Sequence, residues 1–129
     1  MSSIFSKIVN GEIPCYKIAE NEHCLAFLDI NPLKKGHVLV IPKVEVDKFY
    51  DLNDDLLSEL ILFSKKIVKK IEKAFDCKRV GMTIVGLEVP HAHIHLIPIS
   101  TINDMSFSNP KLNLTKQELE EIAEKIVNG

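Results

Sequence analysis

Three of the five histidines in the chain alternate with apolar residues in the segment His91-Ala92-His93-Ile94-His95. Residues two apart in a β-strand lie on the same face, so this spacing predicts three neighbouring imidazoles, with Ala92 and Ile94 facing the core. Imidazole can bind zinc, transfer protons near neutral pH or attack an electrophile as a nucleophile. The spacing alone leaves three interpretations open: a metal site, catalysis by imidazole groups, and a solvent-exposed polar face that is rich in histidine.

The elements that must position these histidines can be predicted from hydrophobic spacing and turn residues. Five segments have the apolar or β-branched composition of strands and are bounded by turn residues. They are residues 17–20, 23–29, 37–42, 79–85 and 90–98. Apolar residues spaced by three or four predict a long helix over residues 53–75. Ser3 is a suitable N-cap for a short helix, and the capping box of Thr115 and Glu118 predicts a short C-terminal helix. This order predicts an α+β fold with an antiparallel sheet, one long helix and a short C-terminal helix.

Length, charge and cysteine usage limit the classes of function. A chain of 129 residues is expected to form a single domain, residues 1–129, around one hydrophobic core. The net charge of −2 disfavours a nucleic-acid partner, because dedicated nucleic-acid-binding proteins usually carry a basic excess. No apolar run approaches the ~18 residues of a membrane span, and no secretory signal is visible. The three cysteines form no C-x-x-C pair, so we expect reduced thiols and a cytoplasmic location.

Four segments match a known family in their order and spacing. The triad segment runs from Pro90 to Ile97, and the upstream segments are Ser3–Ile8 with Glu12-Ile13-Pro14, Leu25–Pro32 and Gly36–Lys43. Together they resemble the histidine triad (HIT) superfamily, most closely its Hint, or nucleoside phosphoramidase, branch. The resemblance covers about residues 3–98 and leaves a helical extension at about 101–129. It implies a single HIT domain that binds a purine nucleotide, pairs as a symmetric homodimer and needs no cofactor.

The resemblance also implies a role for each motif residue. His93 takes the position of the nucleophile, which attacks the α-phosphorus and forms a nucleotidyl-histidine that water then hydrolyses. His91, His95 and the upstream His37 would form the proton-handling network around it, with His95 nearest the leaving group. Asp29 matches the carboxylate that accepts hydrogen bonds from the ribose hydroxyls. The apolar walls around the base would come from Phe5, Ile8, Phe27, Ile30 and Leu39.

The chain departs from the family pattern at a structural zinc site that some members possess. The matching positions hold Ser3, Ser6, Glu45 and His91, where those members have two cysteines and two histidines. Three of the four ligands are therefore absent, and serine hydroxyls are poor zinc ligands. We predict that the protein binds no structural metal.

A second departure lies in the loop before the triad. Family members usually carry a longer loop whose amide and hydroxyl groups contact the phosphate, whereas residues 86–90 form only a short connection. Glu88 stands where a serine or threonine is expected, and its carboxylate would repel a phosphoryl group unless it is turned away or paired. Either the shorter loop admits a different leaving group, or Lys34, Lys35 or a residue of the segment 101–110 replaces the lost contacts.

Three kinds of function are compatible with these features. The first is a nucleotide hydrolase or transferase acting on purine nucleoside phosphoramidates or adenylylated compounds, with a dinucleoside polyphosphate hydrolase as a variant. The second is a nucleotide-binding sensor with little catalysis, which the missing phosphate contacts suggest. The third is a metal-dependent enzyme that uses the histidines as ligands. The intact triad, together with His37 and Asp29, favours the first.

Overall fold

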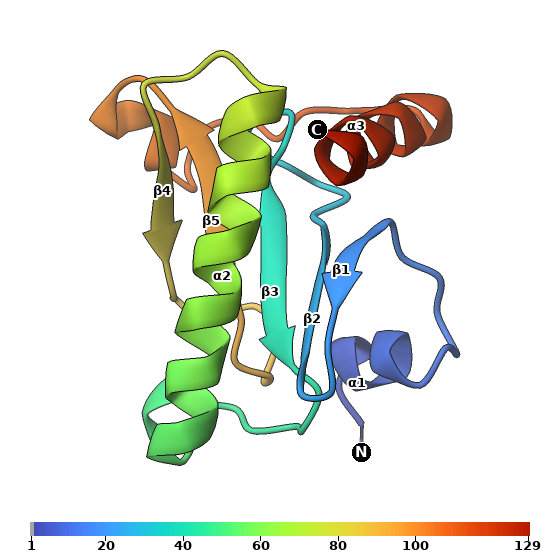
Figure 1. Cartoon of the computed structure of the whole chain (residues 1–129), viewed down its shortest axis with the longest axis vertical. Helices are drawn as coiled ribbons and strands as arrows, with labels where there is room; N and C mark the ends of the chain where they lie inside the picture. The colour runs from blue at the N-terminus through green and yellow to red at the C-terminus, as the bar shows by residue number, and fades with distance from the viewer. Residues whose placement is uncertain (1) are drawn as a thin grey trace.

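The computed structural model describes residues 2–129 and contains a five-stranded antiparallel sheet with the strand order β1-β2-β3-β5-β4 (Figure 1). The strands are β1 (Lys17–Glu20), β2 (Cys24–Leu28), β3 (Val38–Pro42), β4 (Arg79–Thr83) and β5 (Ile94–Ile99). Strand β3 lies in the middle, and β1 and β4 form the two edges. The predicted α+β fold with an antiparallel sheet is confirmed.

Helices lie on both faces of this sheet. The long helix α2 (Asp54–Ala74) and the C-terminal helix α3 (Lys116–Asn128) pack on one face, and Figure 1 shows α2 running lengthwise in front of the strands. Helix α1 (Ile4–Val9) contributes to the cluster on the other face. Two short 3-10 helices, η1 (Phe49–Asp51) and η2 (Ile102–Met105), lie in the connections.

Each α-helix begins at a side chain that caps its first turn. Ser3 accepts a hydrogen bond from the backbone of Ser6, and Asn53 caps α2 in the same way. Thr115 and Glu118 form the predicted reciprocal capping box at the start of α3. These caps satisfy backbone N–H groups that have no partner within the helix, which explains why the helices begin where the sequence predicts.

Strand residues alternate between two hydrophobic clusters. In β2, Cys24, Ala26 and Leu28 pack in the larger cluster, which also contains the apolar stripes of α2 and α3. Leu25 and Phe27 pack in a smaller cluster on the opposite face, and β3 alternates in the same way. Both faces of the sheet are thus buried, and within residues 2–129 the second face is covered by the short helix α1 and loops rather than by a long helix. This leaves room there for a cavity.

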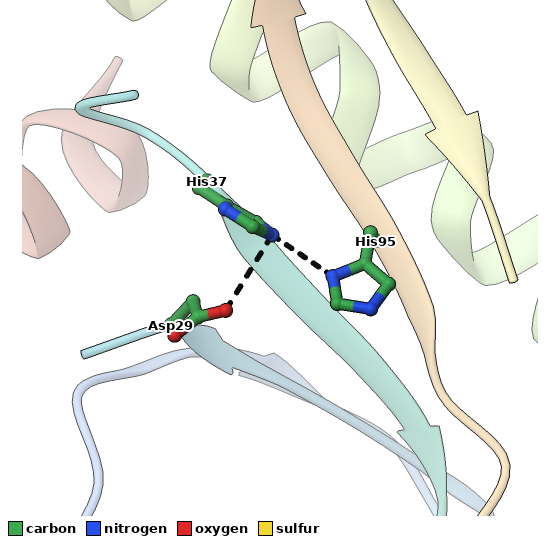
Figure 2. A group of neighbouring side chains, drawn as sticks. All are labelled: Asp29, His37 and His95. Atoms are coloured by element: carbon green, nitrogen blue, oxygen red, sulfur yellow. Dashed lines mark hydrogen bonds and ion pairs between the residues drawn. The ribbon is translucent and has the colours of Figure 1, made fainter. Parts of the chain in front are cut away.

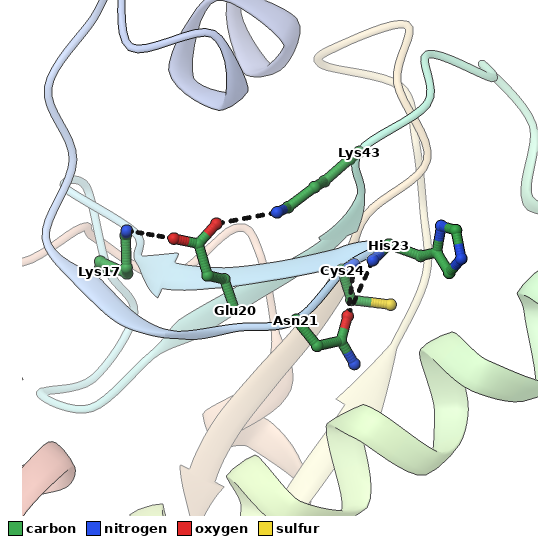
Figure 3. Close-up of polar contacts among 6 residues, drawn as sticks. All are labelled: Lys17, Glu20, Asn21, His23, Cys24 and Lys43. Atoms are coloured by element: carbon green, nitrogen blue, oxygen red, sulfur yellow. Dashed lines mark hydrogen bonds and ion pairs between the residues drawn. The ribbon is translucent and has the colours of Figure 1, made fainter.

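Polar contacts fix the turn between β1 and β2 (Figure 3). The side-chain oxygen of Asn21 accepts hydrogen bonds from the backbone N–H groups of His23 and Cys24, at 3.1 and 2.8 Å. The carboxylate of Glu20 lies between the ammonium groups of Lys17 and Lys43, with Lys43 at 2.9 Å. These contacts join the edge strand to the end of β3. His23 itself is exposed.

The predicted strand over residues 90–98 is too long at its start. Strand β5 begins at Ile94, so His91 and His93 precede it. The reason is that the backbone N–H of Ala92 donates to the carbonyl of Val46 at 2.7 Å, and that of His91 donates to Val89 at 2.8 Å, so neither joins the ladder with β3. Side chains still alternate here, because Ala92 and Ile94 belong to the large core cluster. The strands predicted over residues 23–29, 37–42 and 79–85 are also slightly too long. In the structure they are β2 (Cys24–Leu28), β3 (Val38–Pro42) and β4 (Arg79–Thr83).

The C-terminal segment is part of the core rather than an appendage. Leu119, Ile122 and Ile126 of α3 are buried in the larger cluster with α2. The family resemblance did not extend to this region, but its apolar spacing predicted a helix with one buried face. Burial of that face makes α3 a structural element of the domain.

Two expectations from composition can be compared with the described residues. Among residues 2–129, no helix combines the length and apolar character needed to cross a bilayer. Cys15, Cys24 and Cys77 are free thiols, as their spacing predicted.

Truncation of Leu60 on the buried face of α2 tests the importance of this packing. Leu60 is fully buried, so Leu60→Ala is expected to lower the free energy of unfolding by about 2–5 kcal/mol. Leu62 on the same helix is 61% exposed, so Leu62→Ala is expected to change it by less than about 0.5 kcal/mol. Urea unfolding of both variants measures the difference, and equal losses would contradict the assigned faces of α2.

Candidate functional site

The second face of the sheet carries a cavity of about 220 Å³. It is lined by residues from α1, β2, β3, the loop before the triad, and the start of β5. The lining includes the five residues expected to surround a base, Phe5, Ile8, Phe27, Ile30 and Leu39, together with Asp29, His93 and His95. Ile30 is 60% exposed and forms part of the rim, whereas Phe5, Phe27 and Leu39 are buried. Segments far apart in the sequence therefore converge at this cavity.

The alternation of the strands directs the histidines to this face. His95 lies opposite Leu39 in the register of β3 and β5, so the two side chains share one face of the sheet. His37 is two residues before Leu39 and has the same orientation. Gly36 precedes it with a φ of +96°, and a Cβ atom there would lie 2.8 Å from the ring of Phe75. Glycine is thus needed for the tight entry of the chain into β3.

His93 is oriented by the carbonyl group two residues before it. The Nδ1 atom of His93 lies 2.7 Å from the backbone oxygen of His91. Because a carbonyl oxygen only accepts, we assign the proton to Nδ1, which leaves a lone pair on Nε2 of the neutral ring. The ring of Phe5 packs edge-on against His93, with 5.0 Å between the centroids. The result is a fixed imidazole that lines the cavity and, in its neutral form, has its lone pair on Nε2.

His37 and His95 form a hydrogen-bonded pair, which Figure 2 shows with Asp29. The backbone N–H of Leu33 donates to Nδ1 of His37 at 3.1 Å, so Nδ1 carries no proton and Nε2 does. Nε2 of His37 then donates to Nδ1 of His95 at 3.0 Å. This bond in turn places the proton of His95 on Nε2. His95 therefore offers an N–H donor beside the lone pair of His93, and the two ring centroids are 4.9 Å apart.

Burial keeps this pair uncharged. Removal from water, with the neighbouring His95 as the next cause, lowers the pKa of His37 to about 3. Burial also lowers the pKa of His95 to about 4, with His93 as the next cause. Both rings are consequently neutral near pH 7, which is the state that the assigned hydrogen bonds require.

Asp29 lies at the end of β2, next to the same pair. Its Oδ1 atom accepts a hydrogen bond from the backbone N–H of Asn31 at 2.8 Å, and its Oδ2 atom is 3.6 Å from Nε2 of His37. Burial raises the pKa of the Asp29 carboxyl group, and the Asn31 N–H opposes that effect. The residue acts as a turn former and also lines the cavity, where its carboxylate can accept hydrogen bonds.

Asp29, His37 and His95 also satisfy a geometric condition for a metal site. Their possible ligand atoms lie within 4.8 Å of one another, and two nitrogens with one carboxylate oxygen suit a divalent transition metal. An ion would need the facing nitrogens of His37 and His95, which share a proton in a 3.0 Å hydrogen bond. Within residues 2–129, every buried side-chain nitrogen or oxygen has a hydrogen-bond partner. The hydrogen-bonded arrangement is therefore complete without an ion, and the metal interpretation requires breaking it.

The four positions that match the zinc site of some family members are joined by hydrogen bonds. Oε1 of Glu45 accepts from the backbone N–H of Ser3 and from the hydroxyl of Ser6, both at 2.6 Å. The Ser3 hydroxyl donates to Nδ1 of His91 at 2.9 Å, because Nε2 of His91 donates to the carbonyl of Pro42 at 2.8 Å. This network holds the start of α1 against the triad and so places Phe5 beside His93. His91 is fully buried in it and does not line the cavity.

Two residues near the site were not identified from the sequence. The ring of Phe107 packs edge-on against His95 with 4.8 Å between centroids, and Nζ of Lys111 lies 5.0 Å from the Phe107 centroid. Phe107 falls within the segment 101–110, which was expected to supply replacement contacts. Lys34, named for the same role, pairs with Asp104 at 3.2 Å. The segment is polar and irregular, so its sequence carried no periodic signal that could direct a side chain toward His95.

The short loop places Glu88 on the border of the cavity, as its sequence position suggested. Glu88 is exposed and lines the cavity together with Val89. Its negative charge contributes to raising the pKa of Asp29, after the effects of burial and the Asn31 hydrogen bond. This rim of the cavity is therefore unfavourable to an anion.

Comparisons with known proteins agree with this architecture. Residues 10–102 match the HIT domain model. The chain is 37% identical to the adenosine 5'-monophosphoramidase hnt1 of Schizosaccharomyces pombe over 128 residues, covering 98% of this chain and 96% of that protein. It is 46% identical over 99 residues to an uncharacterized HIT-like protein of Methanocaldococcus jannaschii, covering 74% and 77% of the two chains. The crystal structure of a Hit-like protein from Bartonella henselae superposes with a TM-score of 0.85 at 30% identity, covering 98% and 95%.

The buried histidines are expected to make stability depend on pH. The pKa values of His37 and His95 lie near 3 and 4 in the folded protein, against an ordinary value of 6.5. Below about pH 6.5 the unfolded chain therefore binds protons that the folded protein does not. The free energy of unfolding is expected to decrease as the pH is lowered from about 7 to about 5, by on the order of a few kcal/mol. Urea unfolding at about pH 7 and at about pH 5 measures this loss. Both pH values lie above the range in which carboxylates of lowered pKa take up most of their protons, so those groups contribute little to the difference.

A pair of variants isolates the contribution of His37. His37→Asn removes one buried imidazole and is expected to reduce the loss of stability between the two pH values, whereas His23→Asn alters an exposed histidine and should retain it. Asp29, whose pKa is raised, has the opposite effect and is retained in all three proteins. An unchanged loss in His37→Asn would contradict the assignment of a neutral, buried His37.

Proposed function

Because the chain belongs to the HIT domain family, we propose that it hydrolyses or transfers nucleotides from purine nucleoside phosphoramidates or related adenylylated compounds through a nucleotidyl-histidine. The observation that carries this proposal is the orientation of His93, whose Nδ1 atom lies 2.7 Å from the His91 carbonyl oxygen and whose ring lines the cavity. A full-length relative is an adenosine 5'-monophosphoramidase, which supports the same class of substrate.

The cavity supplies separate surfaces for the parts of a nucleotide. Phe5, Phe27 and Leu39 form an apolar wall on which a purine base can pack, and Ile30 extends it at the rim. Asp29 supplies a carboxylate at the edge of this wall, where the two ribose hydroxyls can donate to it. A nucleoside bound in this way would bring its 5'-phosphorus toward His93.

The two imidazoles that line the cavity complement one another in a two-step substitution. In the first step, Nε2 of His93 bonds to phosphorus, the phosphorus–nitrogen bond to the leaving amine breaks, and the amine takes up a proton through Nε2–H of His95. In the second step, a water oxygen bonds to phosphorus, the bond to His93 breaks, and the proton lost by water returns to Nε2 of His95. The products are a nucleoside monophosphate and a free amine. His37 keeps the proton of His95 on Nε2, where the leaving group needs it.

Removal of the proposed nucleophile gives a direct test. His93→Ala is expected to lower the rate of AMP release from an adenosine phosphoramidate by roughly a thousandfold or more, because no other group replaces the bond to phosphorus. AMP binding, measured by calorimetry, should persist, which shows that the variant is folded. His23→Ala changes an exposed histidine outside the cavity and serves as the matched control. Equal turnover by His93→Ala and the unmodified protein would refute the mechanism.

Binding and turnover measurements on the unmodified protein distinguish the alternative functions. AMP binding without turnover across phosphoramidates, adenylylated compounds and dinucleoside polyphosphates would identify a nucleotide-binding sensor. Activity that is lost with a chelator and restored by a divalent metal would identify the metal-dependent alternative, with Asp29, His37 and His95 as ligands. The position of Glu88 on the rim favours the phosphoramidate over a dinucleoside polyphosphate, because a longer phosphate chain adds negative charge near that carboxylate.

We further propose that the protein forms a symmetric homodimer through β4. This strand lies at an edge of the sheet, so one side of its backbone is free to pair with another strand. Three apolar side chains on and after it are exposed: Met82 by 43%, Val85 by 51% and Leu87 by 90%. Pairing of β4 with its copy would bury this apolar surface and satisfy the strand edge about a two-fold axis.

Charged substitutions on this surface test the dimer. Met82→Lys combined with Leu87→Lys is expected to convert a dimer into a monomer in sedimentation equilibrium, because like charges would meet across the two-fold axis. Leu62→Lys places the same charge on an exposed position of α2, away from β4, and should leave the dimer intact. A monomeric unmodified protein, or a double variant that remains dimeric, would exclude an interface at β4.

A further inference from the structure

The segment between η2 and α3 folds against the candidate site. The backbone N–H of Leu112 donates to the carbonyl of Pro32 at 2.8 Å, and Lys34 pairs with Asp104 at 3.2 Å. The first contact joins this segment, and the second joins η2, to the turn that follows Asp29. Residues that the sequence separates from the triad by a polar stretch are thereby held beside the histidine pair.

Phe107 packs against this histidine pair, and Lys111 in turn lies against Phe107. The Phe107 ring lies 4.8 Å from His95 and 6.5 Å from His37, edge-on to both. The ammonium group of Lys111 lies 5.0 Å from the centroid of the Phe107 ring, a distance at which a cation is attracted to the ring face. One aromatic ring therefore separates this ammonium group from His95.

The buried pair of His37 and His95 supplies no positive charge to an anionic ligand. His37 and His95 are neutral near pH 7 because burial lowers the pKa of each, to about 3 and about 4. Glu88 adds a negative charge at the rim of the cavity. The charge of Lys111 reaches the site, since after burial and the neighbouring histidine it further lowers the pKa of His37 and of His95. Lys111 is exposed, so its charge is available to a ligand.

We propose that Lys111 binds the phosphoryl group of the nucleotide and so replaces contacts that the short loop before the triad does not make. This inference rests on the proposed function, because it requires a nucleotide whose phosphorus lies beside His93. The lysine side chain carries a compact charge on a flexible four-carbon stem, which allows it to move from the Phe107 ring to an anionic oxygen. The same charge would stabilise the negative charge that develops on the phosphoryl oxygens during transfer.

A comparison of AMP with adenosine tests this role, because only AMP carries the phosphate. Lys111→Met keeps the length of the side chain and removes its charge, and it is expected to weaken AMP binding about fivefold in calorimetry while adenosine binding is unchanged. Lys111→Arg keeps the charge and should restore most of the AMP affinity. Lys116→Met removes another exposed lysine charge, at the start of α3, and should bind AMP like the unmodified protein.

The possible outcomes distinguish this inference from the proposed function. If the unmodified protein binds AMP and hydrolyses the phosphoramidate but Lys111→Met binds AMP equally well, the role of Lys111 is overturned and the proposed function stands. Equal weakening of AMP and adenosine would also overturn it, because a contact to the base or to the fold would then explain the loss. If the unmodified protein neither binds AMP nor releases it from the phosphoramidate, both proposals are overturned.

Discussion

The alternation of side chains across the sheet is the constraint on which both the core and the candidate site depend. A strand can direct every second residue to the face covered by α2 and α3 only by directing the others to the opposite face. Leu25 and Phe27 of β2 and Leu39 of β3 therefore point to the face on which His95 lies. A register shift by one residue would exchange the two sets and bury the apolar wall of the cavity under α2. The packing of the core thus also positions the site.

Backbone groups determine the protonation states within the site. The carbonyl of His91 fixes the proton of His93, and the N–H of Leu33 fixes that of His37 and, through it, that of His95. Each of these backbone groups has only one possible role as donor or acceptor, so the assigned tautomers follow from the path of the chain. A neutral site of this kind can hold a lone pair and an N–H donor side by side. It also supplies little positive charge to an anionic ligand. A positive charge from the neighbouring segment, such as that of Lys111, therefore matters for binding a phosphoryl group.

Hydrogen bonds join the four positions at which the family resemblance suggested a zinc site. Ser3, Ser6 and His91 share contacts with one another and with Glu45, and together they attach the first turn of α1 to the chain before β5. The Ser3 N–H and the Ser6 hydroxyl hold the pKa of the Glu45 carboxyl group down to about 2, so it remains an acceptor across the physiological range. Because α1 carries Phe5, this attachment also fixes the wall of the cavity beside His93.

The sequence by itself was sufficient to predict the class of fold and the capped helices, because periodicity and turn chemistry are local properties. The expectation that His93, His95 and Asp29 lie together with apolar residues came instead from the resemblance to the histidine triad superfamily. It was insufficient for the start of β5, since the contact between Ala92 and Val46 is a long-range hydrogen bond. The neutral state of His37 was decided by tertiary burial, which no spacing reveals. The approach of Phe107 and Lys111 to His95 was likewise decided by the tertiary structure, because an irregular segment is placed by its distant partners rather than by its own residues.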